Sequence, residues 1–310
     1  MKKIEVISVN ISEKKGTVKN PVEKIILNEK GVSGDAHAGD WNRQVSLLGT
    51  ESITKFERET GKKIGYGEFA ENITTLGFEL HKSNPLDRFV CSDVILEVTQ
   101  IGKECHGTSC NIFRETGNCI MPSEGIFCRV IKPGVLKPGD TMQYLSHEYY
   151  VYILTVSDRA SAGIYKDKSG PAASERITAF FTGKNLTCRV QNDITPDNPE
   201  LIRKKINTAL NEGADIILTT GGTGIGSRDF TPDVVKSIIE KEIPGIMDYI
   251  RFKYGTEKPG AFLSRSIAGT KDRALIYALP GSANAVKEYL SEIEKTLMHS
   301  IYMIHGLDLH

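Results

Sequence analysis

The chain has 310 residues, with 39 Lys and Arg against 39 Asp and Glu, so that it has no formal net charge at pH 7. A chain of this length forms one large domain or two ordinary ones, and its balanced charge provides no basic field for nucleic acid or an anionic membrane. No apolar run approaches the roughly 18 residues of a membrane span, and Glu5 lies where a signal peptide would be apolar. We therefore expect a cytoplasmic protein that binds neither nucleic acid nor membrane, with its six cysteines as thiols or ligands instead of disulfides.

Residues 1–146 are predicted to form a mainly-β domain. One helix is predicted over 50–60, because Thr50 suits its first position and Gly61 suits its end. Short strands separated by frequent turn signals favour a barrel or a sandwich. Alternating or β-branched runs predict strands over 3–12, 21–28 and 93–100.

Four stretches of this first half resemble, in the family order, the MOSC domain, which is named from the C-terminal part of molybdenum cofactor sulfurases. The resemblance covers nearly all of residues 1–145 and implies a β-barrel. In the family a cysteine is proposed to carry sulfur or to contact the cofactor. The stretches are GVSGDAHAG at 31–39 with RQVS at 43–46, FAENITT at 69–75, QIGKECH at 100–106 and LKPGD at 136–140.

The resemblance places the family's cysteine at Cys105, and it implies Arg43 as an anion contact and His37 as a residue that lines the same site. Lys103 and His106 are cationic neighbours of the kind that favour a thiolate at Cys105. The alternatives are a buried structural thiol, a solvated loop histidine and a surface arginine. A metal site is a further alternative, although close CxxC pairs are missing; it would be formed by Cys105, His106, Cys110, Cys119 and Cys128.

From residue 149 onward, predicted strands and helices alternate. This pattern predicts a mainly parallel sheet covered by helices, a three-layer α/β domain over 149–310. Ligands of such sheets bind beyond the carboxyl ends of the strands. We therefore expect Ser157, Asp158, Arg159, Asp193 and the loop 221–229 on one edge. The strands are predicted over 150–156, 186–190, 216–219 and 274–278, and the helices over 171–181, 198–210, 232–241 and 282–305.

A glycine-rich loop follows the predicted strand 216–219, in the stretch IILTTGGTGIGSRDFTPD. Thr231 is predicted as the N-cap of the next helix, with Pro232 as its first residue. A glycine loop between a strand and a helix N-terminus binds anions through backbone N–H groups. Arg228 adds a forked cation suited to phosphate, and Asp229 adds an oxygen ligand suited to Mg²⁺. The loop is no Walker A motif, because Ser227 and Arg228 replace Lys-Ser/Thr; the alternative is a turn without a ligand.

The segment GGTGIGSRDFTPD resembles the signature of the MogA/MoaB-type molybdenum cofactor biosynthesis family, which includes bacterial molybdopterin adenylyltransferase and the G domain of gephyrin. Residues 157–171 and 263–269, and the LPGS at 279–282, match as well, so the resemblance covers essentially all of 149–310. It implies that ATP gives its adenylyl group to molybdopterin with the help of Mg²⁺. It also implies a homo-oligomer, a trimer in this family.

The resemblance assigns roles to individual residues. Asp193 and Asp229 match two important aspartates, with catalysis and Mg²⁺ binding as their roles. From the residues alone, Asp193 is equally a turn residue, and Asp158 and Arg159 could pair with each other. The substrate-binding residues are Ser157, Asp158, Arg159, Gly221, Gly222, Thr223, Gly224, Arg228, Ser264 and Ser266.

Together these patterns predict a bifunctional protein of molybdenum cofactor maturation. The second domain would adenylylate molybdopterin, and the first would bind the cofactor or carry sulfur through Cys105. The partners would be the small-molecule substrates, other maturation proteins and molybdoenzymes. The alternative is a carrier or scaffold that binds the pterin without catalysis, which would tolerate the loss of Asp193 or Asp229.

Overall fold

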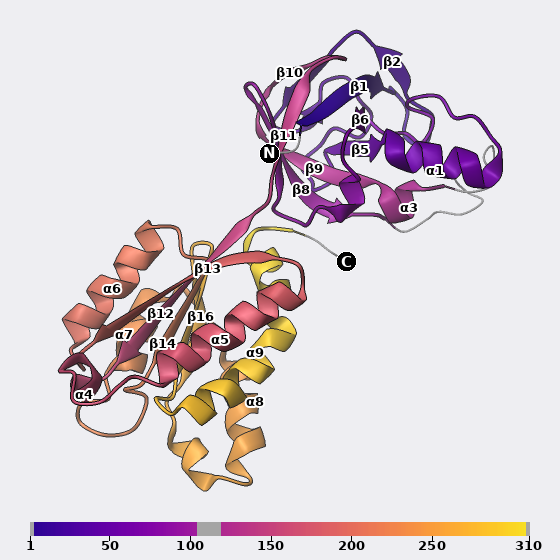
Figure 1. Ribbon diagram of the computed structural model, residues 1–310. Helices are drawn as coiled ribbons and strands as arrows, with labels where there is room; N and C mark the ends of the chain where they lie inside the picture. The colour runs from indigo at the N-terminus through magenta and orange to yellow at the C-terminus, as the bar shows by residue number, and fades with distance from the viewer. Residues whose placement is uncertain (1–2, 104–118, 308–310) are drawn as a thin grey trace. The chain divides into compact units, whose positions relative to one another are not determined.

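The computed structural model describes residues 3–103 and 119–307. The chain divides into two compact units: the first comprises the described residues up to His147 together with Leu307, and the second covers Glu148–Gly306. Figure 1 shows the strands and helices of each. No helix within the described ranges combines the length and the apolar character that a bilayer span requires.

The first unit is a β-barrel, as the sequence predicts. Strand β1 pairs with β6 on one side and with β11 on the other, so the strand order β11-β7-β8-β9-β5-β6-β1 closes on itself. Strand β2 extends this sheet, and β10, β3 and β4 form a small second sheet. The bounds are β1 Lys3–Ile11, β2 Asn20–Val22, β3 Ile25–Asn28, β4 Gly31–Val32, β5 Val45–Gly49, β6 Ile73–Leu76, β7 Arg88–Cys91, β8 Val94–Ile101, β9 Ile126–Lys132, β10 Gly134–Leu136 and β11 Thr141–Leu145.

Helix α1 (Thr50–Thr60) has the predicted bounds. It ends because Gly61 takes a left-handed conformation, with φ +71°, and donates its N–H to Glu57 O. The side chain of Phe56 packs edge-on against Phe69, with 5.1 Å between the ring centroids. The sequence did not predict the two short helices of this unit, η1 (Leu80–Lys82) and α3 (Met121–Glu124).

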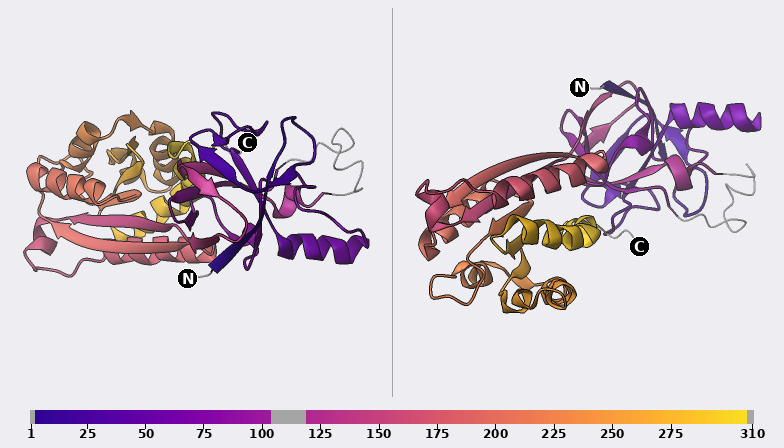
Figure 2. Two further views of the ribbon diagram at one scale, coloured as in Figure 1. Left: turned by 90° about the horizontal axis from the view of Figure 1, so that it is seen from above. Right: turned by 60° about the horizontal axis from the view of Figure 1, so that its bottom comes forward.

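The second unit contains a six-stranded sheet in the order β13-β12-β14-β17-β16-β15. The first four strands pair in parallel, whereas β16 and β15 run antiparallel to their neighbours. The long strands β12 and β13 run side by side in the left view of Figure 2. The bounds are β12 Glu148–Val156, β13 Thr187–Thr195, β14 Ile216–Thr220, β15 Lys241–Glu242, β16 Ile267–Lys271 and β17 Ala274–Leu279.

Helices cover both faces of this sheet. Helices α6 and α7 share a core with Tyr152 and Leu154 of β12, and α5 and α9 pack against each other on the sheet. Tyr149 stacks on Phe181 of α5, with 4.8 Å between the ring centroids. Burial on both faces explains why β12 is almost entirely apolar or aromatic between the exposed Glu148 and Thr155. The bounds are α4 Asp158–Ser161, α5 Ser169–Gly183, α6 Pro199–Asn211, α7 Thr231–Ile238, α8 Pro244–Gly255, η3 Pro259–Leu263 and α9 Ala283–Ile304.

The helix predicted over 232–241 is shorter than expected. It ends at Ile238, because Ile239 takes an extended conformation and the chain continues into β15. The prediction of Thr231 as the N-cap is also wrong: Phe230 occupies that position, and Thr231 is the first helical residue. Helix α8 and strand β16 had no clear signal in the sequence.

Candidate functional site

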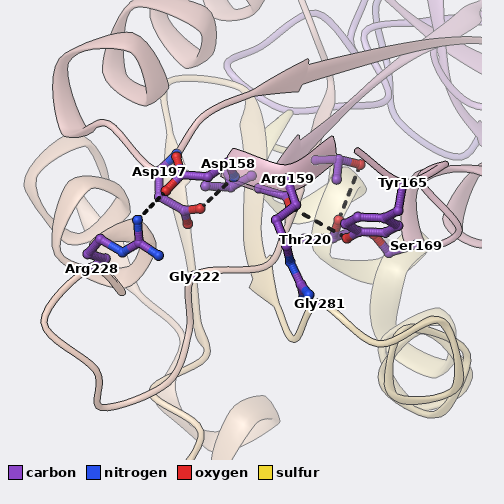
Figure 3. Close-up of a pocket in the computed structure, with 12 residues that line it drawn as sticks. Asp158, Arg159, Tyr165, Ser169, Asp197, Thr220, Gly222, Arg228 and Gly281 are labelled. Carbon is purple, nitrogen blue, oxygen red and sulfur yellow. Dashed lines mark hydrogen bonds and ion pairs between the residues drawn. The ribbon is translucent and has the colours of Figure 1, made fainter. Parts of the chain in front are cut away.

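A pocket of about 380 Å³ lies at the carboxyl ends of β12, β14 and β17 (Figure 3). It is the edge at which the sequence predicted a ligand, since parallel strands present their carboxyl ends together. Stretches far apart in the chain meet here. The lining residues are Thr155, Val156, Ser157, Asp158, Arg159, Tyr165, Ser169, Asp197, Thr220, Gly222, Arg228 and Gly281.

The glycine loop begins where β14 ends, and two of its glycines have positive φ, +99° at Gly221 and +62° at Gly222. The N–H of Gly221 donates to Leu279 O at 3.0 Å, which ties the loop to the end of β17. A Cβ on Gly221 would overlap the carbonyl oxygen of Val156. The loop therefore requires glycine at Gly221 for its conformation and for its close approach to β12.

Replacing Gly221 with alanine should destabilise the second unit by about 1–3 kcal/mol, because the substitution combines a positive φ with a backbone clash. Urea unfolding followed by circular dichroism measures the change. Trp41 is the chain's one tryptophan, so its fluorescence reports on the first unit alone. The urea midpoint measured by this fluorescence should stay unchanged in the variant. Gly245→Ala is the control, since a Cβ there meets nothing within 4 Å; equal unfolding curves for the two variants would contradict the prediction.

Asp158, Asp197 and Arg228 form one network at the mouth of the pocket (Figure 3). The N–H of Asp158 donates to Asp197 Oδ2 at 2.9 Å, and the N–H of Asp197 donates to Asp158 Oδ1 at 2.9 Å. Arg228 Nη1 lies 2.7 Å from Asp158 Oδ2. The reciprocal bonds hold two carboxylates together beside an exposed guanidinium, an arrangement that suits a phosphate with a bound cation.

Asp193, in contrast, does not reach the pocket. It lies within β13, opposite Leu154, and its carboxylate accepts bonds from Lys205 Nζ at 2.5 Å and Tyr152 Oη at 3.0 Å. Partial burial would raise its pKa, but the bonds from Lys205, the Ile194 N–H and Tyr152 outweigh it and lower the pKa. Asp193 therefore forms an ion pair with Lys205 of α6, whereas Asp197 lines the pocket.

The sequence did not single out Asp197. A signal was present, because Asp197 follows Thr195, the last residue of β13, and the residues just beyond a parallel strand are those that face ligands. Asp193 is still inside the strand. The choice between these two aspartates depended on where β13 ends, and the predicted strand, 186–190, ended too early.

Asp229 stabilises its own loop, since its Oδ2 accepts the N–H of Gly226 at 2.8 Å. Arg265 holds the same loop from outside: Nε donates to Gly224 O at 2.9 Å, and the guanidinium pairs with Asp233 at 3.0 Å. No role for Arg265 was predicted from the sequence. The structure makes it the residue that fixes the glycine loop against α7.

The remaining predicted residues divide into those that line the pocket and those that do not. Ser157 lines it and caps α4 by accepting the N–H of Ala160 at 3.3 Å. Arg159 lines it too and lies over the ring of Tyr165, 5.4 Å from the centroid, so it does not pair with Asp158. Ser264 and Ser266 bond to each other at 2.8 Å. Ser264, Ser266, the buried Thr223 and the half-buried Gly224 are not lining residues of this pocket.

In the first unit, Asp35 is the centre of a buried polar cluster. Its carboxylate accepts bonds from Lys19 Nζ at 2.5 and 2.7 Å and from the N–H of His37 at 2.9 Å. Burial would raise the pKa of Asp35, but bonds from His37 and Lys19 prevail and lower it; burial lowers the pKa of Lys19. His37 is half-exposed beside this cluster, and the Arg43 guanidinium lies 4.9 Å from the ring centroid of Trp41.

Cys105, His106 and Cys110 lie outside the described residues. Cys119 is half-buried, and Cys128 lies in the barrel core, where burial raises the pKa of its thiol. Within residues 3–103 and 119–307 no group of three or more His, Cys, Asp and Glu side chains is placed to hold a metal ion.

Comparison with known proteins gives two family matches. Residues 152–299 match the family described as a probable molybdopterin binding domain, and residues 34–143 match the MOSC domain.

Several known proteins resemble the second half of the chain. A molybdopterin adenylyltransferase of Helicobacter pylori (strain J99) is 32% identical over 158 residues, which cover 51% of this chain and 88% of that protein. The molybdopterin adenylyltransferase of Escherichia coli K12 is 32% identical over 156 residues, covering 50% of this chain and 77% of that protein. A molybdenum cofactor biosynthesis bifunctional protein of Synechococcus elongatus is 34% identical over 160 residues, which cover 51% of this chain and 48% of that protein.

Proposed function

Because this chain belongs, through its second unit, to the molybdopterin adenylyltransferase family, we propose that the unit transfers the adenylyl group of ATP to the terminal phosphate of molybdopterin and releases pyrophosphate. The observation that supports this most directly is the pocket at the carboxyl edge of the sheet, where the paired Asp158 and Asp197 meet Arg228. Transfer between phosphates requires in-line positioning and charge neutralisation more than covalent help from the protein.

The pocket contains groups suited to positioning the substrates and to neutralising their phosphate charge. Arg228 supplies a fixed positive charge for a phosphate, and the glycine loop, which ends at the N-terminus of α7, supplies backbone N–H donors. Arg159 and Tyr165 form a flat rim against which a heterocycle can stack. Preorganised charges of this kind stabilise the transition state without reorganisation during the reaction.

The oxygens near Gly222 fit Mg²⁺, which prefers oxygen ligands and shares them with substrate phosphates. A Cβ on Gly222 would lie 2.5 Å from Thr231 Oγ1 and 3.3 Å from Asp197 Oδ1, so both oxygens converge there. The Thr231 hydroxyl is buried and has no hydrogen-bond partner in the part of the chain that the structure describes. We assign Mg²⁺ to Asp197 in place of Asp193, with Asp229 shaping the loop beside it.

The first unit, which matches the MOSC domain, is proposed to bind the same cofactor. Arg43 and His37 are its expected contacts, and Cys105 is the expected sulfur carrier. A homo-oligomer, and exchange of cofactor with other maturation proteins and molybdoenzymes, are part of the same proposal.

Pyrophosphate release from Mg-ATP in the presence of molybdopterin tests the activity. The wild type should release pyrophosphate only when the pterin is present. Asp229→Asn should lower the rate at least about tenfold, because the negative charge beside the glycine loop is lost, although the amide oxygen can still accept the Gly226 N–H. Asp272→Asn, an exposed substitution outside the pocket, is the control. Tight pterin binding without any release by the wild type would refute the transferase and favour the carrier.

A further inference from the structure

The floor of the pocket is made of three hydroxyl groups that the proposed reaction has not used. Thr155 comes from the end of β12, Thr220 from the end of β14 and Ser169 from the start of α5. All three line the pocket, and all are at least nine-tenths buried; Ser169 and Thr220 are labelled in Figure 3. Which of them can donate a hydrogen bond to a ligand depends on where their protons are already committed.

Asp167 takes two of these protons. Thr155 Oγ1 donates to Asp167 Oδ2 at 2.7 Å, and Ser169 Oγ donates to Asp167 Oδ1 at 2.9 Å. The same carboxylate accepts the N–H groups of Ser169 at 2.9 Å and Gly170 at 3.1 Å. A Cβ on Gly170 would lie 2.5 Å from Asp167 Oδ2 and 2.8 Å from Thr155 Oγ1, so glycine is what lets this carboxylate reach the helix.

The third proton is committed as well. A hydroxyl carries a single proton and two lone pairs. Since the proton of Ser169 goes to Asp167, Thr220 must be the donor in the 2.9 Å contact between Ser169 Oγ and Thr220 Oγ1. Among the described residues, the only other acceptor that the Thr220 hydroxyl can reach is Thr155 Oγ1, at 3.4 Å. In either case the floor presents lone pairs to the pocket and no proton.

We propose that Asp167, through Thr155, Ser169 and Thr220, makes this floor selective for a ligand edge that donates N–H bonds, the amino edge of a substrate heterocycle. A phosphate offers only acceptors, and facing these lone pairs would leave buried polar groups without partners. The phosphates therefore lie at the cationic rim of Arg228, and the heterocycle points inward. The proposal rests on the proposed function and deepens it, because it orients the substrate. Asp167 acts here as a positioning residue.

Both substrates contain an amino group, ATP in its adenine ring and molybdopterin in its pterin ring. Two pairs of ligands, each differing in this amino group, show which ring the floor recognises. Calorimetric dissociation constants are compared for ATP and purine riboside 5′-triphosphate, which lacks the amino group. They are also compared for pterin and lumazine, which has an oxygen in its place. For one pair the wild type should bind the amino compound about tenfold more tightly, the effect of about one hydrogen bond. The pair that shows the preference identifies the heterocycle.

Variants locate the preference on the floor. Thr220→Val removes an acceptor and should reduce the preference to about twofold or less, by weakening only the amino compound. Asp167→Asn should also reduce it, because an amide donates to one hydroxyl and leaves that hydroxyl's proton free to point into the pocket. Thr219→Val is the matched control: Thr219 precedes Thr220 on β14, is buried, and its hydroxyl has no partner among the described residues.

Three results would overturn this proposal alone. Equal affinity for both members of both pairs would show that the floor does not select an amino edge. A preference that survives Thr220→Val and Asp167→Asn would place the recognition elsewhere. Loss of the preference in Thr219→Val to the same extent would make it a general effect of packing. Pyrophosphate release is measured separately, so that each of these results can occur while the adenylyltransferase activity stands; failure of the wild type to bind any of the four compounds would overturn both.

Discussion

Replacing Asp197 with asparagine should lower the rate of pyrophosphate release by about a hundredfold or more, the usual loss when a group that compensates transition-state charge is removed. The geometry should survive, since an amide oxygen can still accept the N–H of Asp158 and the Asp197 N–H still donates to Asp158. What disappears is the negative charge beside Gly222 that we assign to Mg²⁺. Raising the Mg²⁺ concentration should restore part of the rate, which a purely structural defect would not allow.

Asp193→Asn is the matched comparison, because the family resemblance of the sequence assigned catalysis and Mg²⁺ binding to Asp193. Its carboxylate bonds Lys205 and Tyr152 on the side of α6, so the substitution should change turnover less than about threefold, within what loss of a half-exposed ion pair can do. If Asp193→Asn abolished pyrophosphate release and Asp197→Asn did not, the assignment of Mg²⁺ to Asp197 would be wrong. The assignment to Asp193 from the sequence would then be right.

The contrast between these two aspartates shows what the sequence could decide about the site. The glycine loop was predictable, because strand, glycines and helix start lie next to one another in the chain. The residues that face the glycine loop across the pocket could not be predicted in the same way. Their positions depend on the register of the parallel strands, which no local sequence pattern reveals. Arg265 illustrates the same limit: it fixes the glycine loop from a segment 41 residues away along the chain, and only the fold brings them together.

The fold itself was predicted best where periodicity is strong. Helix α9 and strand β12 have long apolar patterns, and α1 ends at a glycine that can adopt a positive φ. Prediction failed around Ile239, where the backbone leaves the helix to form β15 although no Gly or Pro marks the end of the helix. An edge strand of two residues, Lys241–Glu242, is too short for any alternation to show.

Replacing Lys19 with methionine should destabilise the first unit by about 3–5 kcal/mol, because it leaves the Asp35 carboxylate buried without its charged partner. The two side chains are 1% and 0% exposed, and Lys19 Nζ lies 2.5 Å from Asp35 Oδ2. Urea unfolding followed by Trp41 fluorescence measures the change. The double variant Lys19→Met, Asp35→Asn should recover part of the loss, since no charge is then stranded. Lys30→Met, which breaks the exposed pair with Asp40, should leave the midpoint unchanged.

The dependence on pH separates the stranded charge from a simple packing defect. In the wild type the folded-state pKa of Asp35 is lowered, so this group stabilises the fold above its unfolded pKa of about 3.9 and loses that contribution as the pH falls toward the folded value. In Lys19→Met the stranded carboxylate instead gains a proton as the pH falls. The difference in unfolding free energy between wild type and variant should therefore shrink between pH 7 and pH 4. If the difference in unfolding free energy stayed constant with pH, Lys19 would stabilise the barrel through its packing. Its charge would then not be what stabilises the buried Asp35 carboxylate.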